Sequence, residues 1–331
     1  AMPPGLEGRG GGDELALHTL WEPSKAGTDD DTLTILVFHC GGQHGRSYLK
    51  FARCIAKHLG SPVRILAPDF RGHGDSPLGA ELSDLTFSFG VFADDVLALV
   101  SHLGLYGKAV AVGHSMGASA ALLAEVRRPG TFIGMWLFEP VLFEEKSEAA
   151  AHGEALQRGA RHKRAAFESR QEAIQRYATK LPFRTFDPEC LRDSVVHGFA
   201  GEDGGSVHLK CKPKTEAYLY CLSMKPFAAL PVTIPKVKCR TVLACGTEQG
   251  KENALSRAGN TVRSLLPNGR GERYAFMAHF GPLESPDFVG ERVAFFLRHD
   301  LGLCAGAPGQ VQTFPPGRAQ LTYMHWGSAK L

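Results

Sequence analysis

Residues 111–117 read Ala-Val-Gly-His-Ser-Met-Gly, and they determine the fold more than any other stretch of this chain. They place Ser115 between Gly113 and Gly117 in the pattern G-x-S-x-G, which is typical of a nucleophilic serine on a sharp turn from a strand into a helix. Such a turn strains the serine backbone and leaves no room for bulky side chains two positions before and after it. The flanks agree, because residues 108–112 form an apolar run of strand length and residues 118–126 are rich in helix formers.

Outward from this turn, apolar runs of strand length alternate with stretches of helical periodicity. We expect strands at residues 15–20, 32–38, 62–67, 108–112, 133–138, 238–245 and 273–277, and helices at 48–59, 89–103, 118–126, 254–266 and 288–301. This alternation predicts an α/β fold in which a mostly parallel sheet is covered by helices on both faces.

The alternation breaks between residues 144 and 231, where the sequence is polar and helix-prone and lacks buried-strand runs. We interpret this stretch as a helical cap, or lid, inserted into a core formed by residues 1–143 and 232–303. Residues 304–331 are a C-terminal tail that contains proline and glycine and has no evident role.

The composition excludes several classes of protein. The 331 residues carry 37 basic and 34 acidic side chains, a net charge of +3, so no strong field favours nucleic acid. No apolar run reaches the ~20 residues that span a bilayer. The N-terminus lacks a secretory signal pattern and the eight cysteines show no metal-ligand spacing, so we expect a reduced, cytoplasmic protein without a bound metal. A targeting peptide that has been removed from the chain remains an alternative.

A serine needs an adjacent base to act as a nucleophile at neutral pH. His279 follows the last predicted strand in the loop Met277-Ala-His-Phe-Gly-Pro-Leu-Glu284. Because the loops after parallel strands gather at one edge of a sheet, this loop is predicted to lie beside Ser115. We therefore expect His279 to be the general base.

Two glutamates compete for the acid that would orient this histidine. Glu139 directly follows the strand at residues 133–138, and Glu248 follows the strand at residues 238–245. Both fit the chain order serine, acid, histidine. We favour Glu139, because a carboxylate at the end of a wholly apolar strand is costly without a partner. Glu248 remains the alternative.

The oxyanion of such a reaction needs two backbone N–H donors. The amide of Met116, at the start of the helix after the turn, is one candidate. Gly41, in the loop His39-Cys-Gly-Gly-Gln-His-Gly45, is the other, with its neighbours Cys40 and Gly42 of nearly equal standing. We expect substrate contacts from Cys40, Gly42, His114 and Phe280.

These segments together resemble the α/β-hydrolase superfamily. The resemblance rests on residues 39–48, 69–76, 113–117, 138–141 and 279–286, spread in order over residues 32–303. It implies an eight-stranded, mostly parallel sheet with a lid after the sixth strand. The chain also resembles uncharacterised bacterial-type hydrolases, and zearalenone lactonases are similar in placing a glutamate after the sixth strand. Many members instead have an aspartate after the seventh strand, where this sequence reads Gly-Thr-Glu-Gln.

The resemblance implies a serine hydrolase that cleaves a carboxylic ester, lactone or thioester through an acyl-enzyme intermediate and needs no cofactor. Transfer to an alcohol and carbon–carbon bond hydrolysis by the same residues are alternatives. A ligand-binding receptor on a hydrolase scaffold is a further alternative, since fold does not fix function. The expected partner is a small-molecule acyl substrate, whereas the sequence sets neither its identity nor the oligomeric state.

Overall fold

The computed structural model describes residues 15–23, 32–79, 81–144, 146–202, 204–223, 227, 229–247 and 253–303. Its centre is a sheet in the order β1-β3-β2-β4-β5-β9-β10, in which β1 is antiparallel to β3 and the other neighbours are parallel. The strands are β1 (Leu17–Trp21), β2 (Leu33–Phe38), β3 (Val63–Pro68), β4 (Ala109–His114), β5 (Phe132–Phe138), β9 (Arg240–Gly246) and β10 (Gly269–Tyr274).

The predicted α/β-hydrolase fold is confirmed, but the described sheet has seven strands and not eight. Six of the seven apolar runs in the sequence coincide with strands, and the last, at residues 273–277, overlaps only the end of β10. The count of eight came from the resemblance alone, and no further apolar run in the sequence supplied the missing strand.

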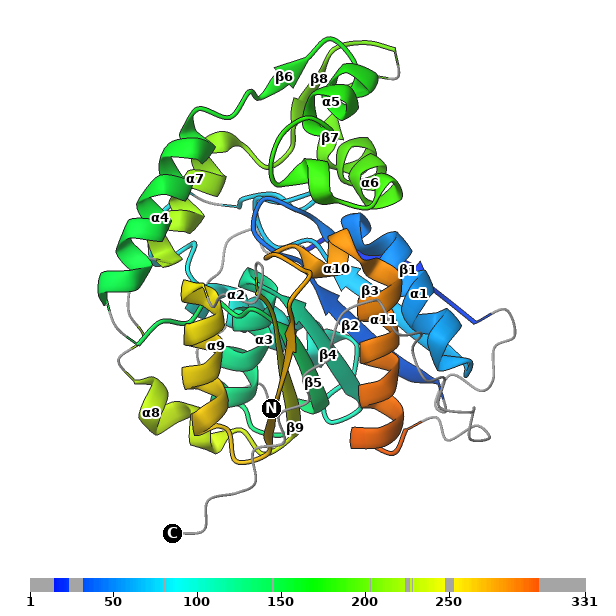
Figure 1. Ribbon diagram of the computed structural model, residues 1–331, viewed down its shortest axis with the longest axis vertical. Coiled ribbons are helices and arrows are strands. Elements are labelled where there is room, and N and C mark those ends of the chain that lie inside the picture. Colours follow the sequence, from blue (N-terminus) through cyan, green and yellow to red (C-terminus); the bar gives the residue numbers. More distant parts are fainter. Residues whose placement is uncertain are drawn as a thin grey trace.

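Helices cover both faces of the sheet (Figure 1). On one face α1 (Leu49–Leu59) packs against α11 (Pro286–Phe295), and on the other α2 (Phe89–His102) and α3 (Met116–Arg127) lie together with α9 (Ala254–Leu265). The central strands β2, β4 and β5 are buried almost throughout, which explains their continuous apolar sequences.

The last strand differs from its predicted position. β10 ends at Tyr274, whereas the sequence predicted residues 273–277. The reason is that β10 buries a charged residue: the Glu272 carboxylate pairs with the guanidinium of Arg292 at 2.9 Å and also contacts Arg270. Hydropathy does not identify a strand whose buried charge is neutralised by residues elsewhere in the chain.

Between β5 and β9 the chain forms the inserted segment, residues 144–231. Its helices are α4 (Lys146–Arg161), α5 (Arg170–Tyr177), α6 (Pro188–Gly198) and α7 (Pro213–Ser223), and α8 (Leu230–Thr233) crosses its C-terminal boundary. The segment is not wholly helical as predicted, because β6 (Ala166–Phe167), β8 (Val207–Leu209) and β7 (Phe199–Ala200) form a small antiparallel sheet. Strands of two or three residues are too short for periodicity to reveal them.

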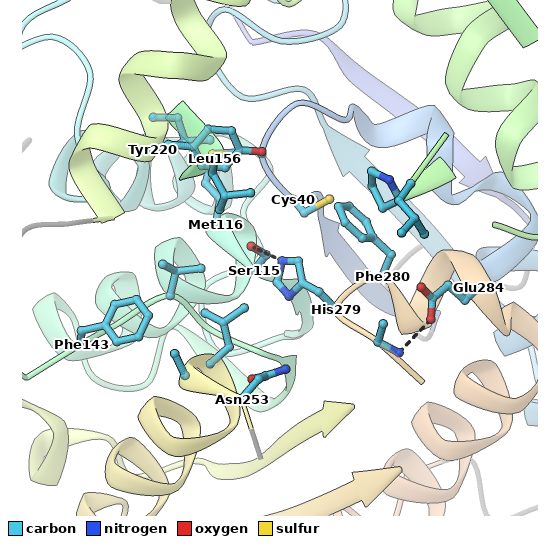
Figure 2. A pocket seen from close by; sticks show the side chains of 18 of the residues that line it. Cys40, Ser115, Met116, Phe143, Leu156, Tyr220, Asn253, His279, Phe280 and Glu284 are labelled. Atoms are coloured by element: carbon cyan, nitrogen blue, oxygen red, sulfur yellow. Dashed lines mark hydrogen bonds between the residues drawn. The ribbon is translucent and has the colours of Figure 1, made fainter. Parts of the chain in front are cut away.

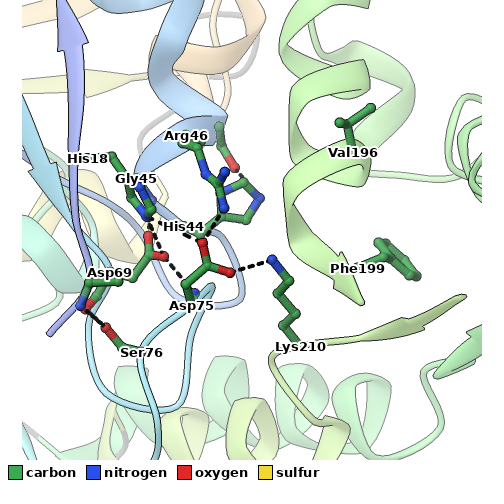
Figure 3. Close-up of polar contacts among 12 residues, drawn as sticks. His18, His44, Gly45, Arg46, Asp69, Asp75, Ser76, Val196, Phe199 and Lys210 are labelled. Carbon is green, nitrogen blue, oxygen red and sulfur yellow. Dashed lines mark hydrogen bonds and ion pairs between the residues drawn. The ribbon is translucent and has the colours of Figure 1, made fainter. Parts of the chain in front are cut away.

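The inserted segment lies across the edge of the sheet where the parallel strands end (Figure 1). Ion pairs fasten it to the core. Lys50 of α1 contacts Asp187 at 2.7 Å, and Asp75 is held between Arg46 of the core and Lys210 of the inserted segment (Figure 3). The inserted segment therefore closes over the edge at which the predicted site residues gather.

Two further predictions concern the C-terminal tail and the absence of a membrane-spanning helix. Residues 304–331 lie outside the described residues. Within the described part of the chain, none of the helices combines the length and the apolar character that a bilayer-spanning helix requires.

Candidate active site

Ser115 occupies the turn between β4 and α3 with a backbone φ of 55°. Its amide donates to the carbonyl of Phe138 at 2.8 Å, which anchors the turn to β5. A Cβ atom on Gly113 would lie 2.6 Å from Ala118 Cα, and one on Gly117 would lie 2.3 Å from the carbonyl oxygen of Phe38. Both glycines are therefore required by close backbone approach, as the sequence pattern predicts.

Glu139 directly follows β5 and also has a positive φ, 46°. Its amide donates to the carbonyl of Ala244 at 2.9 Å, and its side chain turns into the protein, where the residue is 1% exposed. One carboxylate oxygen, Oε1, accepts a hydrogen bond from the Gly246 amide at 2.9 Å. The other oxygen is left for His279.

His279 joins these two residues into one hydrogen-bonded chain. Its Nδ1 lies 2.6 Å from Glu139 Oε2, and its Nε2 lies 3.0 Å from Ser115 Oγ (Figure 2). With the Nδ1 proton donated to the carboxylate, Nε2 is free to accept the serine proton. The three residues follow β4, β5 and β10, parallel strands whose carboxyl ends lie at the same edge of the sheet.

His114 is a correction to the predicted substrate contacts. Its side chain points into the core, where Nε2 donates to the carbonyl of His279 at 2.7 Å and Nδ1 accepts from the Tyr48 hydroxyl at 2.7 Å. Burial, reinforced by the nearby His279, holds the pKa of His114 well below its usual range, so the ring is neutral. His114 thus braces the loop of His279 and does not line the pocket.

Residues 39–45, the glycine loop, face the turn of Ser115. The Cys40 amide donates to the Tyr48 hydroxyl at 3.2 Å, so it is not the amide that would bind an oxyanion. The next residue, Gly41, lines the same pocket as Ser115 and Met116. Gly42, also predicted to contact substrate, has a positive φ of 73° and lines a separate, smaller cavity.

A pocket of about 580 Å³ opens above Ser115 and His279. Cys40 and Phe280 line it as predicted from the sequence, and burial raises the pKa of the Cys40 thiol to about 12, so the thiol is uncharged. Figure 2 shows Ser115 and His279 in the middle, with Phe143 to one side and Phe280 to the other. The sequence analysis missed the wall supplied by the inserted segment, which includes Leu156, Leu181, Pro182, Thr185, Leu219 and Tyr220.

These wall residues carry no recognisable motif. They come from α4, from α7 and from the turn at residues 181–185, and only the fold brings them together. A second addition is Glu284, whose carboxylate accepts the Ala278 amide at 3.0 Å and so steadies the loop before His279. The alternative acid, Glu248, lies outside the described residues.

Within the described residues, one cluster has the spacing of a metal site. His18 Nε2 lies 2.8 Å from Asp69 Oδ2 and 3.9 Å from Asp75 Oδ2. The Asp69 oxygens, however, also accept the amides of Gly45 and Asp75 at 2.7 Å, and Asp75 is paired with two cations (Figure 3). This donor set is used internally, so we interpret the cluster as a structural brace of the glycine loop.

The fold and the site define a class. The model of the alpha/beta hydrolase family matches residues 35–292, and the chain belongs to this family.

Among known proteins the chain is similar to lipases over part of its length. Human monoglyceride lipase is 33% identical over 132 residues, which are 39% of this chain and 40% of the lipase. The sn-1-specific diacylglycerol lipase ABHD11 of Mus musculus is 34% identical over 101 residues, 30% of each chain. The chain thus matches two fifths or less of the length of these relatives.

Solved structures are similar over most of the chain. E-2-(acetamidomethylene)succinate hydrolase superposes with a TM-score of 0.67 at 19% identity, covering 86% of this chain and 94% of that one. The peroxisomal alpha-beta-hydrolase Lpx1 of Saccharomyces cerevisiae gives a TM-score of 0.64 at 20% identity and covers 92% of both chains. At these identities the likeness concerns the fold.

Proposed function

We propose that this protein is a serine hydrolase that cleaves a carboxylic ester, lactone or thioester through an acyl-enzyme intermediate. The observation that carries the proposal is the chain Glu139–His279–Ser115, with separations of 2.6 and 3.0 Å, at the floor of a largely apolar pocket. Nucleophile, base and orienting acid are the three parts that acyl transfer requires.

In the proposed mechanism His279 Nε2 accepts the hydroxyl proton as Ser115 Oγ attacks the carbonyl carbon. The amides of Gly41 and Met116 stabilise the oxyanion, with the N-terminus of α3 adding its dipole. Glu139 keeps the Nδ1 proton in place and stabilises the imidazolium that forms. His279 then protonates the leaving group, and a water molecule, deprotonated by the same nitrogen, releases the acid.

For the substrate we propose a small molecule with an apolar acyl group. The pocket lining supports this, because it is built mainly from side chains such as Phe89, Val141, Leu156 and Leu255. Relatives and structural neighbours named as lipases, an esterase and a thioesterase domain agree with acyl chemistry in general.

We further propose that residues 144–231 act as a cap on a core of residues 1–143 and 232–303. Support comes from the position of α4 and α7, which contribute Leu156, Leu219 and Tyr220 to the pocket. A cytoplasmic location remains a prediction from the cysteine pattern of the sequence.

The experiment is a substrate screen with purified wild type and Ser115→Ala. We expect the wild type to release acid from p-nitrophenyl esters, a lactone or an acyl-CoA thioester, and the variant to release none above background. Adding methanol distinguishes hydrolysis from transfer, because a transferase would yield the methyl ester as the main product. A wild type that binds such ligands as tightly as Ser115→Ala and turns over none of them would contradict the proposal and favour a receptor.

A further inference from the structure

Helix α7 of the inserted segment presses on two glycines of the glycine loop. A Cβ atom on Gly41 would lie 2.2 Å from Leu219 Cδ2, and one on Gly42 would lie 2.7 Å from Glu216 Oε1. Real Cβ atoms essentially never approach other atoms within 3.0 Å, so a side chain at either position would displace the end of Leu219 or Glu216, and the positive φ of Gly42, 73°, also favours glycine there. The backbone that presents the Gly41 amide is therefore in contact with the inserted segment as well as with the core.

Glu216 brings a buried carboxylate to this contact. The residue is 7% exposed, its Oε2 lies 2.8 Å from Lys163 Nζ, and the Tyr220 hydroxyl donates to its Oε1 at 3.3 Å. Burial by itself would lower the pKa of Lys163, but the Glu216 carboxylate outweighs burial and raises that pKa above its usual value. The two residues thus form a charged pair directly behind the glycine loop.

The charge of this pair matters for the proposed reaction. Negative charge would develop beside the Gly41 amide, one residue from the site that Glu216 touches. An unpaired carboxylate there would repel the oxyanion, and in a site shielded from water such repulsion is strong. Lys163 cancels the charge of Glu216 while holding the carboxylate against Gly42.

We propose that Lys163 and Glu216 are positioning residues for the oxyanion site, which they complete from the inserted segment. The pair fixes the Gly41-Gly42 backbone against α7 and keeps the Glu216 carboxylate from opposing the transition state. Lys163 does not line the substrate pocket but the smaller cavity beside Gly42. It therefore acts only through Glu216 and the glycine loop. This inference rests on the proposed function.

The test compares wild type, Lys163→Met, Glu216→Gln and the double variant in hydrolysis of a p-nitrophenyl ester. For Lys163→Met we expect kcat to fall about 30-fold with KM changed less than about twofold, since the unpaired carboxylate opposes only the transition state. Affinity for a trifluoromethyl ketone, which places an oxyanion in the same site, should fall by a similar factor. The double variant is neutral and should recover kcat to within about fivefold of wild type.

Two further variants serve as controls. Tyr218→Phe removes a hydroxyl of the same helix that donates to Asp84 at 2.9 Å, away from the glycine loop, and should leave kcat unchanged. Lys163→Arg keeps the charge and should retain most of the activity. All rates are expressed per site that reacts with a fluorophosphonate, so misfolded protein does not count.

The inference is overturned if Lys163→Met keeps the wild-type kcat and inhibitor affinity, or if the double variant is no faster than Lys163→Met. If Lys163→Met yields no folded protein, Lys163→Gln, which removes the charge but can still donate a hydrogen bond to Glu216, decides: a fivefold or larger fall in kcat at constant KM supports the inference, and a smaller fall overturns it. A wild type that neither reacts with the fluorophosphonate nor cleaves esters contradicts the proposed function itself, which is a separate result.

Discussion

The pocket has two walls that are built on different principles. On the side of the sheet, Ser115 and Glu139 both hold positive φ angles, and each carboxylate oxygen of Glu139 has a hydrogen-bond partner. On the other side, apolar side chains such as Leu156 belong to elements fastened to the core by partly exposed ion pairs, such as that of Lys50 with Asp187. Exposed ion pairs contribute little stability, whereas strained, fully bonded backbone fixes geometry.

The two walls should therefore have different roles in the proposed enzyme. The sheet side holds the reacting groups within hydrogen-bond distance and tolerates little change. The wall residues of the inserted segment shape the pocket and, unlike the Lys163–Glu216 pair, can vary without disturbing the reacting groups. Substitutions on the sheet side should therefore affect kcat most, and those at the pocket wall of the inserted segment should affect the choice of substrate.

The largest effect is expected at the nucleophile. Ser115→Ala should lower kcat for a p-nitrophenyl ester about 10⁵-fold, and His279→Ala should lower it by a similar factor. The two residues act as one unit, so the double variant should be no slower than either single variant. Additive losses, or a residual rate in Ser115→Ala near that of the wild type, would contradict the shared role.

The next effect concerns the orienting acid. Glu139→Gln should lower kcat about 10³- to 10⁴-fold, because the amide neither favours the required tautomer nor stabilises the imidazolium. Glu248→Gln is the matched comparison and should change kcat less than about twofold. The opposite ranking of the two variants would move the role of the acid to Glu248.

Acid should destabilise the sheet side through its buried histidines. Burial lowers the pKa of His39 to about 4 and that of His73 to about 3, whereas the unfolded value is about 6.5. Below pH 6.5 the unfolded chain therefore binds protons that the folded chain does not, and stability falls as the pH falls. Between pH 7 and pH 5 each histidine should reduce the free energy of unfolding by about 2 kcal/mol.

Urea unfolding at the two pH values measures this loss. His73→Gln removes one of the titrating groups and should reduce the difference between pH 7 and pH 5 by about 2 kcal/mol. A variant with the same pH dependence as the wild type would show that His73 does not titrate in this way.

The smallest effect belongs to the pocket wall of the inserted segment. Leu156→Trp fills part of the pocket and should raise KM about tenfold for p-nitrophenyl decanoate, with less than a twofold change for the butyrate. The rate of fluorophosphonate reaction at Ser115 should stay the same. A fall in kcat for both esters would show instead that α4 positions the reacting groups.

The same contrast explains what could be predicted from the sequence. On the sheet side the apolar runs predicted six of the seven strands in place, and G-x-S-x-G with the late loop of His279 predicted residues that the fold brings together. Strand ends converge in any parallel sheet, so order along the chain sufficed there. The charged strand β10 was misplaced because its partner, Arg292, is remote in sequence.

On the other side the sequence predicted an insertion but neither its small sheet nor its pocket residues. Leu181, Leu219 and Tyr220 meet only through tertiary packing, and no local pattern distinguishes them from ordinary apolar residues. The inward turn of His114 was missed for a similar reason, because its partner Tyr48 lies 66 positions away.

The most direct test of the central claim is reaction of the purified protein with a fluorophosphonate, followed by intact mass and peptide mapping. The account predicts one adduct per chain, located on Ser115, and a reaction slowed at least about 10³-fold in His279→Ala. An adduct on another residue, or none under conditions in which the protein is folded, would contradict a nucleophile activated by the Glu139–His279 pair.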